Sequence, residues 1–177
     1  MKLDARIQKI ELILSDVDGV LTDGGLIYGH DGRDVKVFHV RDGLGIKIWR
    51  AAGFHFGLVT ARSSHVVKVR AAELGIELVR QGHEEKFPVV EQIVKDLGME
   101  LEQLCYIGDD LADLACIEAA GLGATVADGV AEVKAAADLV TKASGGQGAV
   151  RELIETLLKG QHRWDDLIRR YHWAGRS

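Results

Sequence analysis

Short apolar runs alternate with helical segments along most of the chain, and this alternation constrains the fold more than any other feature. The apolar runs predict strands at residues 11–15, 54–59, 76–79, 104–107, 123–126 and 139–141. Apolar side chains at helical spacing predict helices at residues 43–52, 64–74, 84–97, 111–119, 130–136 and 149–159. Strands that alternate with helices through short connections form a mostly parallel sheet with helices on both faces. We therefore expect a three-layer, Rossmann-like α/β fold whose ligands bind beyond the carboxyl ends of the strands.

Residues 25–40 break this pattern and predict a β-hairpin inserted after the first strand. Their side chains alternate between apolar and polar, and Asp31-Gly32 supplies a turn signal. An isolated hairpin is only marginally stable in water. Because this one carries several apolar side chains, we expect something to cover it.

The tail of the chain, residues 161–177, is a second exception. Apolar side chains recur there at helical spacing, with charged residues between them, at Trp164, Leu167, Ile168 and Tyr171. A helix of this kind packs either on its own domain or on a neighbouring subunit, and the sequence leaves both open. We expect one domain at residues 1–160, followed by a helical tail.

Composition narrows the classes of protein further. With 177 residues, of which 47% are hydrophobic, the chain suffices for one domain with a proper core. Its net charge of −5 argues against nucleic-acid binding, which normally needs a basic face. No apolar run approaches the ~18 residues of a membrane span, and the first residues lack the apolar stretch of a signal peptide. We therefore expect a cytoplasmic protein that binds neither nucleic acid nor membrane.

Two carboxylates, Asp16 and Asp18, directly follow the first predicted strand. Carboxylates this close repel each other, which raises a pKa unless a cation lies between them. A hard dication such as Mg²⁺ binds carboxylate and carbonyl oxygens and would remove the repulsion. Gly19 then permits a tight turn and a close approach of the backbone to a ligand.

A second acidic cluster, Asp109, Asp110 and Asp113, follows the strand predicted at residues 104–107 and opens a helix. Asp109 and Asp113 are four residues apart and so share one helical face. Either cluster alone could be a surface turn with an N-cap. Two such clusters at the carboxyl ends of strands in one parallel sheet favour a shared cation site.

Two further polar signals lie between the acidic clusters. Thr60 and Arg62 follow the strand at residues 54–59, where a hydroxyl and a guanidinium can hold phosphate oxygens. Lys86 lies near the start of the helix predicted at residues 84–97. By itself a lysine is usually a solvated surface charge, so Lys86 gains weight only from its place in the series.

The order Asp-x-Asp, Thr, Lys, Gly-Asp-Asp-x-x-Asp resembles the four motifs of the haloacid dehalogenase superfamily of phosphotransferases. The resemblance runs from Asp16 to about residue 152. It implies that Asp16 is a nucleophile that forms an aspartyl-phosphate. It implies that Asp18 is the general acid and base, and that Thr60 and Lys86 bind the transferring phosphoryl group.

The same resemblance implies a Mg²⁺ cofactor. Its ligands would be the Asp16 side chain, the Asp18 backbone carbonyl and Asp109. Asp110 and Asp113 would contact these ligands and orient them without binding the metal themselves. Members of the superfamily usually carry a cap domain between the first and second motifs or between the second and third. The first gap of this chain holds only the hairpin and one helix, and the second has no spare length, so we expect no cap domain.

Within the superfamily, residues 38–46, 60–63, 70–76 and 145–152 closely resemble the 3-deoxy-D-manno-octulosonate 8-phosphate phosphatases. That resemblance implies hydrolysis of this sugar phosphate to the free sugar acid and phosphate, in the synthesis of lipopolysaccharide precursors. It also implies a homotetramer in which the hairpin at residues 25–40 of one subunit covers the site of its neighbour.

The resemblance further assigns substrate contacts. They fall on Asp18, His39, Val40, Arg41, Asp42, Gly43, Lys47, Arg62, Arg70 and Lys86. This chain departs from the family at two positions on the substrate side, with His39 in place of the usual Asn and Ala61 in place of the usual Gly.

Three other interpretations remain alongside this one. The substrate could be a nine-carbon sialic-type acid 9-phosphate, or the chain could be an inactive phosphatase-like interaction domain. A signalling receiver domain also uses Asp, Thr, Lys and Mg²⁺ on a parallel sheet. In a receiver, however, the Lys comes last, whereas Lys86 precedes Asp109, and no Asp follows the middle strand near Val79.

Overall fold

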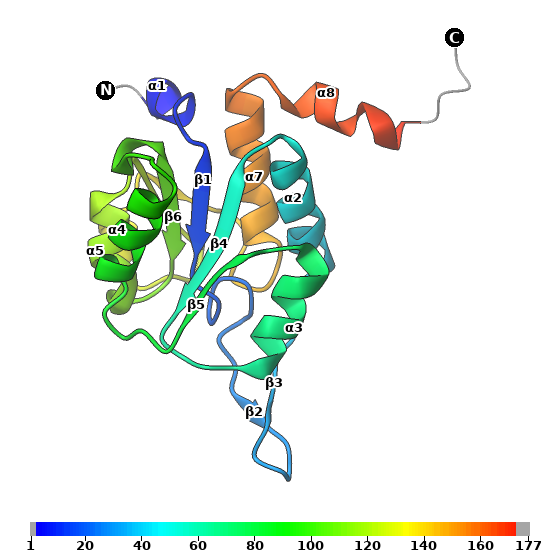
Figure 1. The fold of residues 1–177 in the computed structure, drawn as a ribbon, viewed down its shortest axis with the longest axis vertical. Helices are drawn as coiled ribbons and strands as arrows, with labels where there is room; N and C mark the ends of the chain where they lie inside the picture. Colours follow the sequence, from blue (N-terminus) through cyan, green and yellow to red (C-terminus); the bar gives the residue numbers. More distant parts are fainter. Residues whose placement is uncertain (1–2, 173–177) are drawn as a thin grey trace.

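The computed structural model describes residues 3–172. Its centre is a parallel sheet of six strands in the order β5-β4-β1-β6-β7-β8, drawn in Figure 1. The strands are β1 Leu12–Ser15, β4 His55–Thr60, β5 Leu78–Gln81, β6 Leu104–Gly108, β7 Leu122–Thr125 and β8 Leu139–Val140. The helices are α1 Leu3–Ile7, α2 Val40–Ala51, α3 His65–Leu74, α4 Phe87–Asp96, α5 Leu114–Ala119, α6 Ala131–Ala136, α7 Ala149–Gly160 and α8 Trp164–Ile168. The 3₁₀ turns are η1 Leu101–Gln103, η2 Leu111–Asp113 and η3 Arg169–Tyr171. The predicted three-layer α/β fold is confirmed.

Two buried clusters of apolar side chains hold the layers together. The cluster on one face of the sheet unites α2, α3 and α7, and the cluster on the other face unites α4, α5 and α6. Strand β1 contributes to both, since Ile13 belongs to the first cluster and Leu12 and Leu14 to the second. A strand that is buried on both faces favours apolar residues on both sides, which explains the apolar run Leu12–Leu14 in β1.

Some element boundaries differ from the prediction for local reasons. Helix α2 begins three residues earlier than expected because His39 accepts a hydrogen bond from the Arg41 amide at the N-cap. Strand β5 begins two residues later because Gly75 ends α3 in the left-handed conformation and Ile76 donates back to Ala71. The short helix α1 was not predicted.

The predicted hairpin is present as β2 Ile27–Tyr28 and β3 Asp34–Val35, paired antiparallel. Gly32 has a φ of +75° in the connecting turn, at the predicted position. The hairpin projects from the carboxyl edge of the sheet (Figure 1). Its apolar side chains are exposed in the single chain, at Leu26, Ile27, Tyr28, Val35 and Val37.

Helix α8 packs on its own domain. Trp164 is buried against the α7 side of the core, with the Arg151 and Lys159 cations 5.1 and 5.3 Å from its ring centre. Figure 1 shows α8 at the opposite end of the molecule from the hairpin. The division of the chain at residue 160 stays a prediction, and the last part of the predicted tail, residues 173–177, lies outside the described residues. Within residues 3–172 no helix has the length and apolar character needed to cross a bilayer.

Candidate active site

The two acidic clusters meet at the carboxyl edge of the sheet. Strands β1 and β6 are neighbours in register, with Ser15 opposite Ile107, so the residues that follow them emerge side by side. One carboxylate oxygen from each of Asp16, Asp109 and Asp113 lies within 4.8 Å of the others. The convergence expected from the sequence is therefore present.

Lys86 lies among these carboxylates as a buried cation. Its Nζ is 2.8 Å from Asp16 Oδ2 and 2.7 Å from Asp113 Oδ1. Lys86 occupies the residue before α4, where Pro88 restricts the first turn of the helix. The charges of Asp16 and Asp113 outweigh burial, which acts to lower the pKa of Lys86, and the net effect raises that pKa above its usual value.

Asp113 holds Lys86 and the loop that carries Asp109 in place through hydrogen bonds. Its Oδ1 accepts hydrogen bonds from Lys86 Nζ and from the Tyr106 hydroxyl, each at 2.7 Å. Its Oδ2 accepts from the backbone amides of Asp109 and Asp110 at 3.2 and 3.3 Å. Because Asp113 is fully buried and both oxygens are occupied, it orients Lys86 and the Asp109 loop. Asp110 is exposed and caps η2 through the Leu111 amide.

Three carboxylates, of Asp16, Asp109 and Asp113, face the single cation Lys86, and this excess of negative charge raises the pKa of two of them. Burial, followed by the charge of Asp113, raises the pKa of Asp16 to about 6. Burial, followed by the charges of Asp16 and Asp113, raises the pKa of Asp109 to about 7. Oδ1 of Asp109 is also buried with no hydrogen-bond partner. An oxygen-only donor set with surplus negative charge fits Mg²⁺, which would be held by Asp16, Asp109 and the Asp18 carbonyl.

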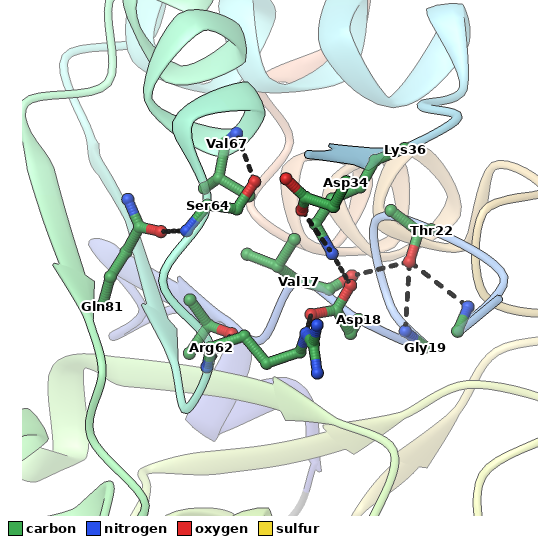
Figure 2. A network of polar contacts seen from close by, with 12 residues as sticks. Val17, Asp18, Gly19, Thr22, Asp34, Lys36, Arg62, Ser64, Val67 and Gln81 are labelled. Carbon is green, nitrogen blue, oxygen red and sulfur yellow. Dashed lines mark hydrogen bonds and ion pairs between the residues drawn. The ribbon is translucent and has the colours of Figure 1, made fainter. Parts of the chain in front are cut away.

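The turn after β1 presses against Asp109. The Thr22 hydroxyl accepts from the Gly19 and Gly24 amides, as Figure 2 shows for Thr22 and Gly19. Gly19 has a φ of +88°, and a Cβ at this position would lie 2.0 Å from Asp109 Oδ2. Glycine is therefore required here both for its backbone conformation and for the close approach.

A second glycine loop supports that turn. A Cβ on Gly145 would lie 1.9 Å from the Gly19 carbonyl oxygen, so the two backbones are in direct contact. The Gly146 amide donates to the Val20 carbonyl at 2.9 Å. These contacts come from the segment at residues 145–152, which carried part of the family resemblance. The segment thus packs against the turn that carries Asp18 and stabilises it.

Asp18 has two cationic neighbours, and Figure 2 shows both. Lys36 Nζ donates to Asp18 Oδ1, and Arg62 Nε lies 3.8 Å from Asp18 Oδ2. Arg62 also donates to the Tyr28 hydroxyl at 2.9 Å, and Lys36 Nζ lies 3.7 Å from Asp34 Oδ2. Lys36 was not among the predicted site residues. The alternation of the hairpin, which puts Lys36 on the opposite face from its apolar neighbours, was the available signal.

Thr60 ends β4, the strand beside β1, and its side chain is buried. Its Oγ1 accepts from the Arg62 amide at 3.4 Å, so the loop after β4 folds back over the hydroxyl. Thr60, Arg62 and Lys86 thus all lie on the carboxyl side of the sheet, as expected from their strands.

The remaining predicted substrate residues gather around the start of α2. Asp42 is 1% exposed, and its Oδ1 accepts from the Arg151 amide at 2.7 Å in the first turn of α7. Burial raises the pKa of this carboxyl. A Cβ on Gly43 would lie 2.4 Å from Arg70 Nη2, so the Arg70 guanidinium covers α2 at that point. Among the described contacts, none joins Asp42, Gly43 or Arg70 to Asp16 or Asp18.

The other members of the set differ in exposure. Val40, Arg41 and Lys47 are exposed along α2, while His39 is half-buried at its N-cap. The structure therefore places Arg62 beside Asp18 and Lys86 beside Asp16, and it gathers the α2 group where α2, α3 and α7 meet.

Comparisons with known proteins agree with this geometry. Residues 69–153 match the model of the haloacid dehalogenase-like hydrolase family. The chain is 41% identical over 159 residues to the 3-deoxy-D-manno-octulosonate 8-phosphate phosphatase KdsC of Haemophilus influenzae, covering 90% of this chain and 88% of that protein. Its identity to the enzyme of the same name from Escherichia coli K12 is 38% over 162 residues, covering 92% of this chain and 86% of that protein.

A solved structure is equally similar. The crystal structure of the 3-deoxy-D-manno-octulosonate 8-phosphate phosphatase of Moraxella catarrhalis, in complex with magnesium ion, phosphate ion and a KDO molecule, superposes with a TM-score of 0.93. The two chains are 40% identical, and the match covers 96% of this chain and 97% of the other. The family resemblance seen in the motifs is confirmed. With relatives this similar over almost its whole length, the chain belongs to the 3-deoxy-D-manno-octulosonate 8-phosphate phosphatase family of haloacid dehalogenase-like hydrolases.

Proposed function

We propose that this chain is a Mg²⁺-dependent phosphatase that hydrolyses 3-deoxy-D-manno-octulosonate 8-phosphate to the free sugar acid and phosphate. The observation that carries the proposal is the meeting of Asp16, Asp109 and Asp113 at the carboxyl edge of the sheet, with Lys86 paired to Asp16 and Asp113. The relative from Moraxella catarrhalis, whose structure holds magnesium, phosphate and KDO, is 40% identical over almost the whole chain. This similarity supports the choice of substrate.

In the proposed first step, a carboxylate oxygen of Asp16 attacks phosphorus in line. The bond between phosphorus and the sugar oxygen breaks, and the Asp18 carboxyl gives its proton to that oxygen. Thr60 and Lys86 hold the phosphoryl oxygens during transfer. Bound Mg²⁺ would supply the further positive charge that two anions need in order to approach each other.

In the proposed second step, the Asp18 carboxylate takes a proton from a water molecule, which attacks phosphorus in the aspartyl-phosphate. The bond between phosphorus and the Asp16 oxygen breaks, and this releases phosphate and restores both aspartates. Asp113 takes no part in bond making, because both of its oxygens are used in orienting Lys86 and the Asp109 loop.

Arg62 is the best placed of the proposed substrate residues, since it lies beside Asp18 and is itself exposed. The contacts proposed for His39, Val40, Arg41, Gly43, Lys47 and Arg70 would require the substrate, or a neighbouring subunit, to extend to the start of α2. Asp42 is better explained as a structural link between α2 and α7, because its carboxylate is buried and bonded to the α7 backbone.

We also propose a homotetramer formed through the hairpin at residues 25–40. The exposed apolar side chains of β2, β3 and their flanks support this proposal, because a single chain leaves them in water. The cytoplasmic location and the place in lipopolysaccharide precursor synthesis stay predictions.

The experiment is a phosphate-release assay on the purified chain with Mg²⁺. Its substrates are 3-deoxy-D-manno-octulosonate 8-phosphate and a nine-carbon sialic-type acid 9-phosphate. A higher kcat/KM for the eight-carbon substrate is expected. Faster turnover of the nine-carbon substrate would overturn the substrate assignment. Absence of Mg²⁺-stimulated release from either compound would support an inactive interaction domain instead.

A further inference from the structure

The Asp18 carboxylate is held between two segments that are distant in sequence. Lys36, the first residue after β3, donates to Oδ1 from the hairpin, and Arg62 approaches Oδ2 from the loop after β4. Figure 2 shows the two cations on opposite sides of the carboxylate. The residue proposed to transfer protons is therefore not a free side chain at the mouth of the site.

Lys36 is the one lysine of the hairpin at residues 25–40, and its side chain is only 2% exposed. Removing an ammonium group from water is unfavourable unless anions compensate for the loss of hydration. Among the described residues, the ion-pair partners of Lys36 are Asp18 and the neighbouring Asp34. The burial of this lysine is therefore tied to the carboxylate of Asp18.

The two oxygens of Asp18 differ in what they contact. Oδ1 receives the Lys36 hydrogen bond, whereas Oδ2 is buried and has no hydrogen-bond partner. An anchored Oδ1 fixes the rotation of the carboxyl group and leaves Oδ2 as the oxygen that no hydrogen bond occupies. Proton transfer needs the acid within hydrogen-bond reach of the leaving oxygen, so fixing this rotation has a direct kinetic consequence.

From these contacts we propose that Lys36 is a positioning residue of the phosphatase reaction, which holds Asp18 so that Oδ2 can serve the leaving oxygen and later the water. This inference rests on the proposed function. It gives the hairpin a task in the active site of its own chain, in addition to any contact between subunits. Val35 and Val37, on either side of Lys36, are exposed and free for such contacts.

The test compares two esters that differ in their need for an acid. The alkoxide of the sugar leaves only when it is protonated, whereas p-nitrophenolate is a stable anion that leaves without a proton. The constant kcat/KM covers the steps up to phosphoryl transfer to Asp16. For Lys36→Met we expect a fall of about 10- to 100-fold in kcat/KM for the sugar phosphate, a part of the 10²–10⁴ that general acid catalysis supplies. For p-nitrophenyl phosphate we expect a change of no more than about 3-fold, since that ester needs no general acid.

Two further variants separate positioning from a general loss of structure. Lys36→Arg keeps the cation and should restore most of the activity on the sugar phosphate. In an Asp18→Asn background, Lys36→Met should cause no further loss, because a residue that acts through Asp18 has nothing left to position. Lys95→Met, which removes an exposed lysine from α4, should leave both esters unaffected.

Thermal unfolding and light scattering on each variant report whether the fold and the assembly survive. If Lys36→Met does not fold, Lys36→Gln and Lys36→Arg supply the comparison of the two esters. Equal losses on both esters, or losses that multiply in the Asp18→Asn background, would overturn the inference and assign Lys36 to phosphate binding or to folding. A wild-type chain inactive on both esters would instead overturn the proposed function itself.

Discussion

Lys86 Nζ lies 2.8 Å from Oδ2 of Asp16, and both side chains are buried. Asp113 shares the same ammonium group at 2.7 Å. One cation therefore serves two carboxylates, and the pKa of Asp16 rises to about 6 because burial and the charge of Asp113 outweigh Lys86. The proposed nucleophile, Asp16, therefore lies beside one positive charge that is too small to balance the carboxylates around it. A bound divalent cation would supply the missing positive charge.

Replacement of the nucleophile is the most direct test of the mechanism. We expect Asp16→Asn to lower kcat by on the order of 10⁴-fold or more, as loss of a nucleophile does in other enzymes that form covalent intermediates. The fold should survive, because the amide fills the same space. Phosphate release and circular dichroism check the two points. Substantial residual turnover would contradict the assignment of Asp16.

The stability of the metal-free protein should depend on pH through Asp109. Burial raises its pKa to about 7, whereas the ordinary value is 3.8. Between these values the folded state binds more protons than the unfolded state, so the contribution of Asp109 is present at low pH and is lost as the pH rises through about 7. Urea unfolding in EDTA across this range should show a shallower decline for Asp109→Asn. An unchanged pH profile in that variant would argue against the raised pKa.

Magnesium should reverse this effect, because it binds the ionised carboxylates. At a Mg²⁺ concentration 100 times its dissociation constant, the free energy of unfolding should rise by about 2.7 kcal/mol. Asp109→Asn should lose most of this gain, and EDTA should abolish turnover by the wild type. Differential scanning calorimetry with and without Mg²⁺ measures the shift. Equal stabilisation of the two proteins would remove Asp109 from the metal site.

Asp42 offers a test between two roles. If it links α2 to α7, Asp42→Ala should lower the free energy of unfolding by about 1–2 kcal/mol, the usual cost of a lost helix cap. Asp42→Asn keeps an acceptor for the Arg151 amide and should cost less. A loss of kcat/KM without a loss of stability would return Asp42 to the predicted substrate contacts.

The glycine loop at residues 145–146 should be sensitive to a single methyl group. Gly145→Ala places a Cβ that would lie 1.9 Å from the Gly19 carbonyl oxygen, so the glycine loop and the turn after β1 must separate. We expect a loss of about 1–3 kcal/mol in stability, as for other overpacked sites, together with a lower kcat. Gly53→Ala is the control, since nothing lies within 4 Å of a Cβ there and only its positive φ is strained.

The sequence by itself determined the layered fold and the meeting of Asp16 with the second acidic cluster, Asp109 and Asp113. Hydrophobic periodicity is a local property, and parallel strands bring their carboxyl ends to one edge wherever they stand in the chain. Local signals also placed the hairpin turn at Asp31-Gly32.

Only the tertiary structure decided which side chains meet within that edge. Lys36 and Asp18 are 18 residues apart, and Asp42 and Arg151 are 109 apart. Such pairs depend on how the hairpin and the helices are placed against the sheet, and neither alternation nor spacing encodes that placement. The same limit applies to Asp42, whose place at the start of α2 does not show that its carboxylate is buried against α7.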